Sequence, residues 1–555
     1  MRVSAKARPL LLVLLSYALF TTAAPAAAPT TQPVDLLAGA SWKWKVYPIA
    51  AKPTTRPATG PTAEAFRLAG EAEFQVAYPP RYAALELAHG LNPLYKMHFA
   101  LNGHEIRLPL EGMLYRVIPG IDAAWLVEGT NVLTADAAIA ETKGTTKPTE
   151  DVLKRLEADG PNAQHPFREM KLLALCPEDV KVTIGPILGA TDEESFTVTC
   201  RTNMPARVTL TAMTSFTGLG GKDLTGPLGR VVNKRVKTTS PAGLLHRFKV
   251  EGIDPRGCYH LEPQMRDGAD SATLLSPLRL KGLPKDGKLR FVAMGDNRSN
   301  PESWGKVAAA ALQADPDLVI HTGDLVSQGR HDWLWEDQFF TPAKDLLAAV
   351  PFYPVIGNHE GDAPLYYELF YTPGDEGRGK NWQQTISGVL LIGIDGQADW
   401  SADGENVKWL EGVLAGSKAK FIFLVTHYPA WSSSKHGRTD PNTAQPAEKA
   451  SRQARQVILP LLAKYRAAAM IAGHDHNYQR SEPPEGVTVI VTGGAGAPLY
   501  EESQEAGKQN PYSQAFAAVL HYCLFVIEGD ACTMQALTPE GETLDTRIWR
   551  ARTCP

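Results

Sequence analysis

Residues 468–480 read AAMIAGHDHNYQR: an apolar run, a glycine, and two histidines on either side of an aspartate. Continuous apolar runs of this kind are typical of strands buried on both faces of a sheet. Helical stretches such as 304–314 and 452–466 separate several further runs after Pro284, which are RFVAM, PDLVIHTG, FYPVIG, VLLIGID, FIFLVTH and VTVIVTG. The pattern predicts a layered α/β domain over residues 286–555.

Polar side chains follow five of these predicted strands at the point where each strand ends. Because the carboxyl ends of strands in layered α/β folds form the ligand crevice, we expect these side chains to converge on one pocket. A Gly-His-x-His sequence is expected by chance far less than once in 555 residues that include 14 histidines. The residues at the strand ends are Asp296, Asp324, Asn358, His359, Glu360, His427, His474, Asp475 and His476.

These residues, in this order, resemble the signature of the calcineurin-like metallophosphoesterases, and GHDHNYQR at 473–480 is similar to the block found in the purple acid phosphatase branch. The resemblance covers about residues 286–540 and implies an αββα sandwich. It also implies two metal ions bridged by Asp324, and His359 beside the substrate as a general acid or as a stabiliser of the transferring phosphoryl group. The remaining implied ligands are Asp296 and His476 for one ion, and Asn358, His427 and His474 for the other.

The implied chemistry suits these residue types. Two cations neutralise phosphoryl oxygens and lower the pKa of a bridging water, so that a metal-bridging hydroxide can attack a phosphomonoester near neutral pH. Imidazole and oxygen ligands without thiolate favour zinc, manganese or iron, as divalent or mixed-valence ions, and the sequence does not choose among them. The resemblance therefore implies a metal-dependent phosphoric ester hydrolase of the acid phosphatase type, acting on a small or polymer-linked phosphate ester.

Three positions depart from the family pattern or leave two interpretations open. Arg298 stands where many metallophosphoesterases carry a histidine ligand, and it either clamps a substrate phosphate or pairs with a neighbouring carboxylate. Ser327 stands where purple enzymes carry the tyrosine that colours their iron, which predicts a colourless enzyme. His436 is either a second active-site histidine, as its spacing from His427 suggests, or a solvated loop residue.

Two all-β regions are expected before the α/β domain. Short apolar segments broken by turn signals predict a β-sandwich over residues 27–172, which is either a structural accessory domain or a galactose-binding-like jelly roll that binds carbohydrate. Residues 173–285 alternate between apolar and polar positions. Their segment GPILGATDEESFTVTCRTNMPARV resembles the fibronectin-type-III-like domain that precedes the catalytic domain of purple acid phosphatases.

The amino terminus and the overall composition bear on the location and the partners of the protein. Three basic residues, the apolar run PLLLVLLSYALF and then small residues predict a signal peptide over residues 1–26, and hence a secreted or periplasmic protein without a membrane span. The formal net charge of −4 gives no reason to expect a nucleic-acid partner. The six cysteines permit up to three disulfides in an oxidising compartment, or act as buried thiols.

Two other functions compete with phosphomonoester hydrolysis. The first is a phosphodiesterase, because the same metal pair serves both reactions. The second is a cell-surface polymer-binding protein in which the two sandwiches bind and the phosphatase domain is degenerate. The retained set of strand-end ligands argues against the second. The sequence leaves the natural substrate open.

Overall fold

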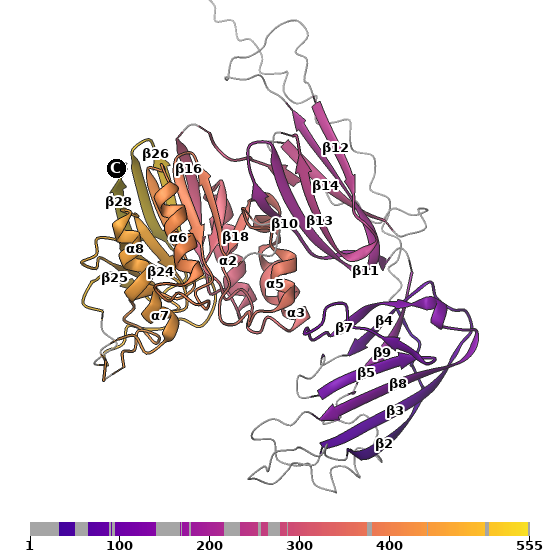
Figure 1. Cartoon of the computed structure of the whole chain (residues 1–555). Coiled ribbons are helices and arrows are strands. Elements are labelled where there is room, and N and C mark those ends of the chain that lie inside the picture. Colours follow the sequence, from indigo (N-terminus) through magenta and orange to yellow (C-terminus); the bar gives the residue numbers. More distant parts are fainter. Residues whose placement is uncertain are drawn as a thin grey trace, which may run out of the picture.

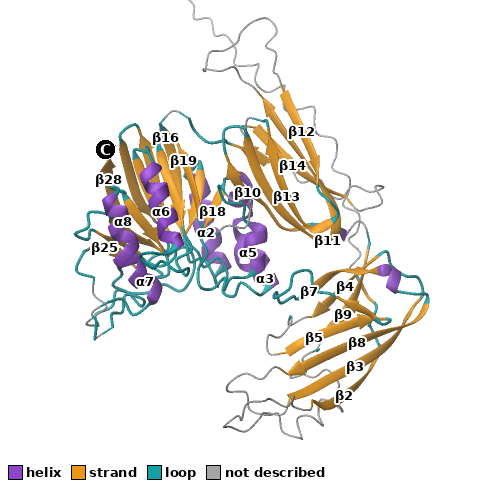
Figure 2. Ribbon diagram, in the orientation of Figure 1, coloured by secondary structure: helices purple, strands orange, loops and turns teal. Residues whose placement is uncertain are grey.

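The computed structural model shows two all-β regions followed by an α/β domain (Figures 1 and 2). Within its described residues the strands form five sheets. The predicted signal peptide and Cys554 lie outside the described residues. The structure describes residues 33–49, 65–87, 90, 95–139, 167, 169–176, 179–215, 233–253, 257–264, 278–285, 287–374, 380–440, 442–443, 445–505 and 510–552.

The first β region consists of two sheets that pack around one apolar core. The smaller sheet has the order β1 (Val34–Asp35), β9 (Met170–Leu175), β4 (Tyr82–Leu87) and β7 (Val117–Asp122). The larger sheet has the order β2 (Ser41–Ile49), β3 (Ala65–Val76), β8 (Gly129–Ile139), β5 (Tyr95–Leu101) and β6 (His104–Ile106), and a short 3₁₀ turn, η1 (Ala123–Trp125), precedes β8. The predicted boundary at residues 172 and 173 falls inside β9, which pairs with β4.

The second β region is organised around one long strand, β11 (Ser195–Ser215). Its first half pairs with β10 and β13, and its second half pairs with β12 and β14. The pairing with β13 shifts register between Arg201 and Ala206, where Pro205 has no N–H to donate to the ladder. The other strands are β10 (Val182–Thr191), β12 (Asn233–Thr239), β13 (Gly243–Glu251), β14 (Gly257–Gln264) and β15 (Leu278–Leu280).

The α/β domain has two facing sheets with helices on both outer sides, which confirms the predicted layered fold (Figure 1). Between the sheets, Phe291 stacks on Phe525 at 4.4 Å between ring centroids and meets Phe423 of the opposite sheet at 5.6 Å. One sheet has the order β18 (Phe352–Pro354), β17 (Leu318–His321), β16 (Lys288–Met294), β26 (Tyr522–Glu528), β27 (Ala531–Leu537) and β28 (Thr543–Arg550). The other has the order β19 (Trp382–Ile386), β20 (Val389–Gly393), β21 (Phe421–Val425), β22 (Ala469–Ala472), β24 (Thr488–Thr492), β23 (Tyr478–Ser481) and β25 (Ser513–Ala517).

The helices bury their apolar sides against the two sheets. α2 and α4 cover the sheet that contains β16, and α6 and α8 cover the sheet that contains β21. None of the helices in the described ranges is both long enough and apolar enough to cross a membrane. The helical elements are α2 (Pro301–Gln313), α3 (Asp332–Leu334), η3 (Trp335–Phe340), α4 (Thr341–Ala349), α5 (Pro364–Leu369), α6 (Glu405–Gly416), α7 (Lys449–Gln453), η4 (Ala454–Ile458) and α8 (Leu459–Lys464).

A loop of the first β region docks on the α/β domain. The backbone N–H of Leu114 donates to Arg330 O at 2.7 Å, and the N–H of Asp332 donates to Leu114 O at 2.8 Å. Arg201 of the second β region forms an ion pair with the same residue, Asp332. All three regions therefore meet at residues 330–332, which lie a few residues beyond Asp324.

Candidate metal centre

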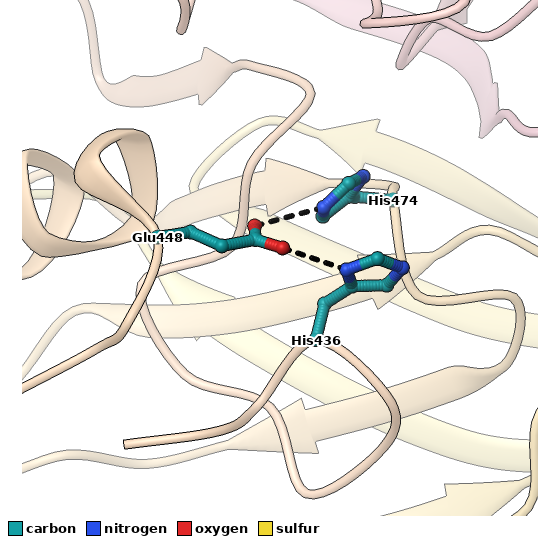
Figure 3. Close-up of side chains that lie close together, drawn as sticks. All are labelled: His436, Glu448 and His474. Carbon is teal, nitrogen blue, oxygen red and sulfur yellow. Dashed lines mark hydrogen bonds and ion pairs between the residues drawn. The ribbon is translucent and has the colours of Figure 1, made fainter. Parts of the chain in front are cut away.

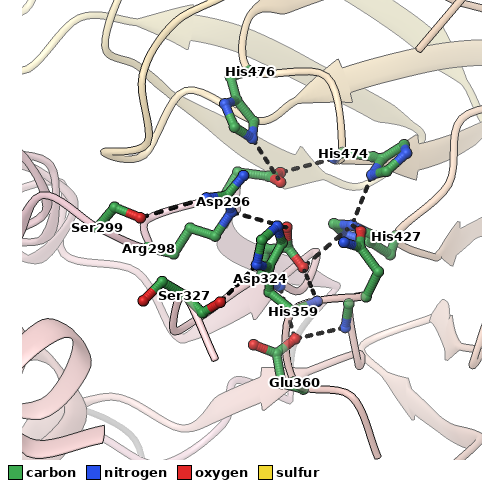
Figure 4. Close-up of polar contacts among 12 residues, drawn as sticks. Asp296, Arg298, Ser299, Asp324, Ser327, His359, Glu360, His427, His474 and His476 are labelled. Carbon is green, nitrogen blue, oxygen red and sulfur yellow. Dashed lines mark hydrogen bonds and ion pairs between the residues drawn. The ribbon is translucent and has the colours of Figure 1, made fainter. Parts of the chain in front are cut away.

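The structure brings most of the predicted strand-end residues together in one place, and Figure 4 labels Asp296, Asp324, His359, Glu360, His427, His474 and His476. They follow β16, β17 and β18 in one sheet and β21 and β22 in the other. Asp296, Asp324 and the three histidines His427, His474 and His476 are almost fully buried. A cluster of ionisable side chains this deeply buried needs compensating partners or a bound ion.

Three candidate ligand residues, which lie just after strand ends, have a left-handed backbone conformation. The φ angle is 59° at Asp296, 57° at Asp324 and 71° at His474. Such a conformation is uncommon for residues other than glycine and costs of order 1–3 kcal/mol, so it persists where the surroundings hold it. Two neighbouring glycines leave space for the carboxylates, because a Cβ at Gly357 would collide with Asp324 Oδ1 and one at Gly473 with Asp296 Oδ2.

Asp296, Asp324 and His476 form the first group of donors. One donor atom from each of the three lies within 4.8 Å of the others. Asp296 Oδ1 is buried and has no hydrogen-bond partner among the described residues, and it lies 3.7 Å from His476 Nε2. Burial, together with the charge of Asp324, raises the pKa of Asp296 well above its ordinary value. A cation between the two carboxylates would relieve this repulsion and would satisfy the orphaned oxygen.

Asn358, His427 and His474 form the second group, with Asp324 between the two groups. His427 Nε2 lies 3.0 Å from Asn358 Oδ1, 3.2 Å from His474 Nδ1 and 3.4 Å from Asp324 Oδ1. Burial would raise the pKa of Asp324, but the neighbouring rings of His427 and His359 outweigh burial and lower it. The ionised carboxylate of Asp324 thus faces both groups, as a bridging ligand must.

The rings of His427 and His476 are held in the same way. In His427 and His476 the Nδ1–H donates to a backbone carbonyl, Thr322 O at 2.8 Å and Pro498 O at 2.6 Å, which leaves Nε2 unprotonated toward the centre. Burial lowers the pKa of His427 to about 4 and that of His476 to about 3. Both rings are therefore neutral near pH 7, in the form that can bind a cation.

His359 lies at the edge of the same cluster. Its Nδ1–H donates to Ser327 O at 2.7 Å, and its Nε2 lies 3.8 Å from Asp324 Oδ2. Its backbone is held as well, because its N–H donates to Asp324 Oδ1 at 3.0 Å and its carbonyl accepts from the N–H of Gly329 at 2.8 Å. The side chain is 31% exposed, so the ring lies between the buried cluster and the solvent.

Glu360 braces the loops that carry the candidate ligands. Its carboxylate accepts from the backbone N–H groups of Asp324 at 2.9 Å, Leu325 at 2.8 Å and Gly357 at 2.7 Å. Burial and the charge of Asp324 raise the pKa of Glu360 to about 8. This strand-end carboxylate therefore ties the loop after β17 to the loop after β18.

Arg298 pairs with a carboxylate of the cluster. Its Nε lies 3.2 Å from Asp324 Oδ2, and its Nη1 donates to Ser299 Oγ at 3.4 Å. The side chain is 16% exposed. Of the two interpretations of Arg298, this arrangement fits the carboxylate pair.

His436 lies against a candidate ligand. Its ring centroid is 3.8 Å from that of His474, and its backbone N–H donates to Asp475 Oδ1 at 2.9 Å. Asp475 also accepts from Ser432 Oγ at 2.5 Å, so its carboxylate is engaged with the 432–436 loop.

Two residues near the centre carried no signal in the sequence. Glu448 accepts hydrogen bonds from His436 and His474, and Tyr500 stacks on His476 at 4.1 Å between centroids and 16° between planes. Burial alone would raise the pKa of Glu448, but these two hydrogen bonds outweigh it and lower the pKa. Both residues lie in irregular loops, where neither periodicity nor a motif distinguishes them.

The α/β domain is similar in sequence to known phosphoesterases. Residues 289–478 match the family model described as calcineurin-like phosphoesterase. Tartrate-resistant acid phosphatase type 5 of Oryctolagus cuniculus is 33% identical over 253 residues, which is 37% of this chain and 72% of that protein. The protein named "Probable inactive purple acid phosphatase 24" of Arabidopsis thaliana is 26% identical over 272 residues, which is 43% of this chain and 40% of that protein.

A solved structure extends the likeness over most of the chain. A purple acid phosphatase from yellow lupin (Lupinus luteus) seeds superposes with a TM-score of 0.55 over 91% of this chain and 95% of its own, at 14% identity. At that identity the superposition shows a shared fold. The resemblance that the strand-end motifs indicated is confirmed: the chain belongs to the calcineurin-like phosphoesterases, a family of metal-dependent phosphoric ester hydrolases, alongside the purple and tartrate-resistant acid phosphatases.

Proposed function

We propose that this protein hydrolyses phosphomonoesters at a dinuclear metal centre. One observation carries the proposal: unprotonated ring nitrogens converge on two buried carboxylates, one of which has an oxygen without a partner among the described residues. Such a set of nitrogen and oxygen donors suits zinc, manganese or iron. The proposed ligands are Asp296, Asp324, Asn358, His427, His474 and His476.

When bound, two such cations supply positive charge for the phosphoryl oxygens and acidify water. The residues of the chain then position and protonate the substrate. Arg298, anchored on Asp324, offers its remaining guanidinium N–H groups to a phosphoryl oxygen. His359, in its protonated form, has an Nε2–H that donates toward the leaving oxygen. His436, whose ring centroid lies 3.8 Å from that of His474, is proposed as the second active-site histidine.

The test combines metal analysis with hydrolysis of a small ester panel. We expect two bound ions per chain, and higher kcat/KM for a phosphomonoester than for the matching diester. Faster hydrolysis of the diester would favour a phosphodiesterase with the same centre. A protein that holds fewer than two ions and hydrolyses neither ester would overturn the proposal.

A polymer-binding protein with a degenerate phosphatase domain is the rival from another class. One relative is named as inactive, which is the reason to test this alternative. The full set of donors in the cluster argues against it, because a lapsed site has no reason to keep buried carboxylates with an unsatisfied oxygen. Carbohydrate binding by the first sandwich stays a prediction that the comparisons do not support.

We also propose that the protein is exported and acts outside the cytoplasm, either secreted or in the periplasm. The proposal rests on the charge and apolar pattern of residues 1–26. The cysteines do not add to this proposal, because in the described part Cys200, Cys258, Cys523 and Cys532 are thiols. Sequencing of the amino terminus of protein recovered outside the expressing cell tests the proposal, and an intact terminus would contradict cleavage.

A further inference from the structure

The carboxylate of Glu448 lies between two histidines of the candidate centre (Figure 3). Its Oε2 lies 2.9 Å from His474 Nε2, and its Oε1 lies 2.7 Å from His436 Nδ1. Each oxygen therefore accepts from a different ring. The two rings are themselves 3.8 Å apart between centroids, at 38° between planes. One side chain thus holds a proposed metal ligand and its neighbour at the same time.

His474 differs from the other site histidines in how its ring is held. His427, His476 and His359 all donate Nδ1–H to backbone carbonyls. His474 is reversed: its Nε2 points outward, and its Nδ1 points inward, 3.2 Å from His427 Nε2. A backbone carbonyl is present whatever the side chain, whereas among the described residues the outward hydrogen-bond partner of the His474 ring is the Glu448 carboxylate.

A carboxylate can only accept from His474, so Nε2 must carry the proton and Nδ1 is left unprotonated. Loss of this acceptor would free the ring to change tautomer or to turn, and Nδ1 would no longer be fixed toward the centre. Within the described ranges, the hydrogen bonds of the Glu448 side chain go to these two rings. It immediately precedes α7, but its side chain makes no hydrogen bond that caps this helix.

We propose that Glu448 is a positioning residue for the dinuclear centre: it fixes the tautomer and orientation of His474 and holds His436 beside it. The proposal rests on the proposed function, because it concerns one of the two ions of that centre. It assigns to Glu448 the carboxylate–histidine–metal relation seen at many metal sites, in which loss of the carboxylate typically costs 10–100-fold in metal affinity or activity.

The experiment measures zinc binding to the metal-free full-length protein by titration calorimetry. The variants are Glu448→Gln, which keeps the shape but can accept from only one ring, and Glu448→Ala, which accepts from neither. Glu262→Gln is the matched control, because Glu262 Oε1 lies 3.0 Å from His260 Nε2 in the second β region, away from the centre. Thermal unfolding of each metal-free protein reports whether the fold survives.

We expect the wild type and Glu262→Gln to bind two zinc ions with the same affinities. In Glu448→Gln one of the two affinities should fall about 10–100-fold while the other and the metal-free melting temperature stay unchanged, and Glu448→Ala should lose at least as much. Cobalt in place of zinc gives a second readout, since the visible spectrum of one of two cobalt ions should change.

The outcomes separate this inference from the proposed function. Two unchanged affinities in both Glu448 variants, beside a wild type that binds two ions, would overturn the positioning role alone. A wild type that binds no zinc would overturn both. A fall in both affinities together with a lower metal-free melting temperature would show a general loss of structure, and that result would also count against a specific role for Glu448.

Discussion

Replacing His359 with alanine tests whether this side chain donates a proton or only stabilises the phosphoryl group. The ring lies at the edge of the cluster, with Nε2 3.8 Å from Asp324 Oδ2 and 31% of the side chain exposed. The backbone N–H of His359, and not its ring, donates to Asp324 Oδ1, so the substitution leaves this bond in place. The variant loses the ring's bond to Ser327 O, about 1 kcal/mol of stability.

The expected loss of activity depends on the leaving group. A positioned acid contributes about 10²–10⁴-fold, which corresponds to about 3–5 kcal/mol of transition-state stabilisation. For an alkyl phosphate, whose alkoxide must be protonated as it leaves, kcat/KM of His359→Ala should fall by this amount. For a nitrophenyl phosphate, whose phenolate leaves without a proton, the fall should be about tenfold or less.

The assay compares kcat/KM of metal-loaded wild type, His359→Ala and the control His331→Ala on both esters. His331 is a nearby histidine whose ring packs on Trp333 at 4.7 Å between centroids, outside the cluster. Equal losses on the two esters would refute proton donation and leave His359 as an electrostatic stabiliser. Near-normal turnover on both would refute any catalytic role.

Three further outcomes are expected. Because Ser327 stands where purple enzymes carry their tyrosine, iron-loaded protein should be colourless, and a visible absorption band would contradict this. Arg298→Lys should lower kcat/KM about tenfold or more, through loss of a charged hydrogen bond, and an unchanged value would end the phosphate-clamp interpretation. His246 is buried and its pKa is lowered to about 4, so the folded state prefers the neutral ring; stability is retained above pH 6.5 and about 3 kcal/mol is lost as pH falls from 6.5 to 4. Urea unfolding of wild type and His246→Asn at pH 7 and pH 4 checks this, because the variant should lack that part of the pH dependence.

The first β region contributes to the position of His359, although it supplies none of the proposed ligands. Through its backbone N–H and carbonyl, Leu114 of this region forms hydrogen bonds with residues 330 and 332 of the segment 327–332. In the same segment, the carbonyl of Ser327 accepts a hydrogen bond from the His359 ring, and the N–H of Gly329 donates to the His359 carbonyl. The edge of the α/β domain that carries His359 is thus contacted from outside that domain.

The layered fold could be predicted from local sequence because its strands are continuous apolar runs. All three residues of β18 and all five residues of β21 are buried. A continuous apolar run in the sequence indicates this complete burial. Strand β11 continues through Pro205, which breaks the pairing with β13 without ending the strand. A proline signals lost pairing in the sequence, but whether the chain turns there depends on the partner strands.

The donors of the candidate centre could be named from sequence, but the orientation of their rings could not. Each donor directly follows a strand, and strand ends in one layered domain meet at one edge, so local sequence was sufficient to gather them. Which nitrogen faces the centre depends instead on outward partners such as Thr322 O, Pro498 O and the Glu448 carboxylate. Two of these are backbone atoms that every residue type offers, and the third comes from a loop without a motif. The step from a list of candidate donors to their oriented arrangement therefore required tertiary structure.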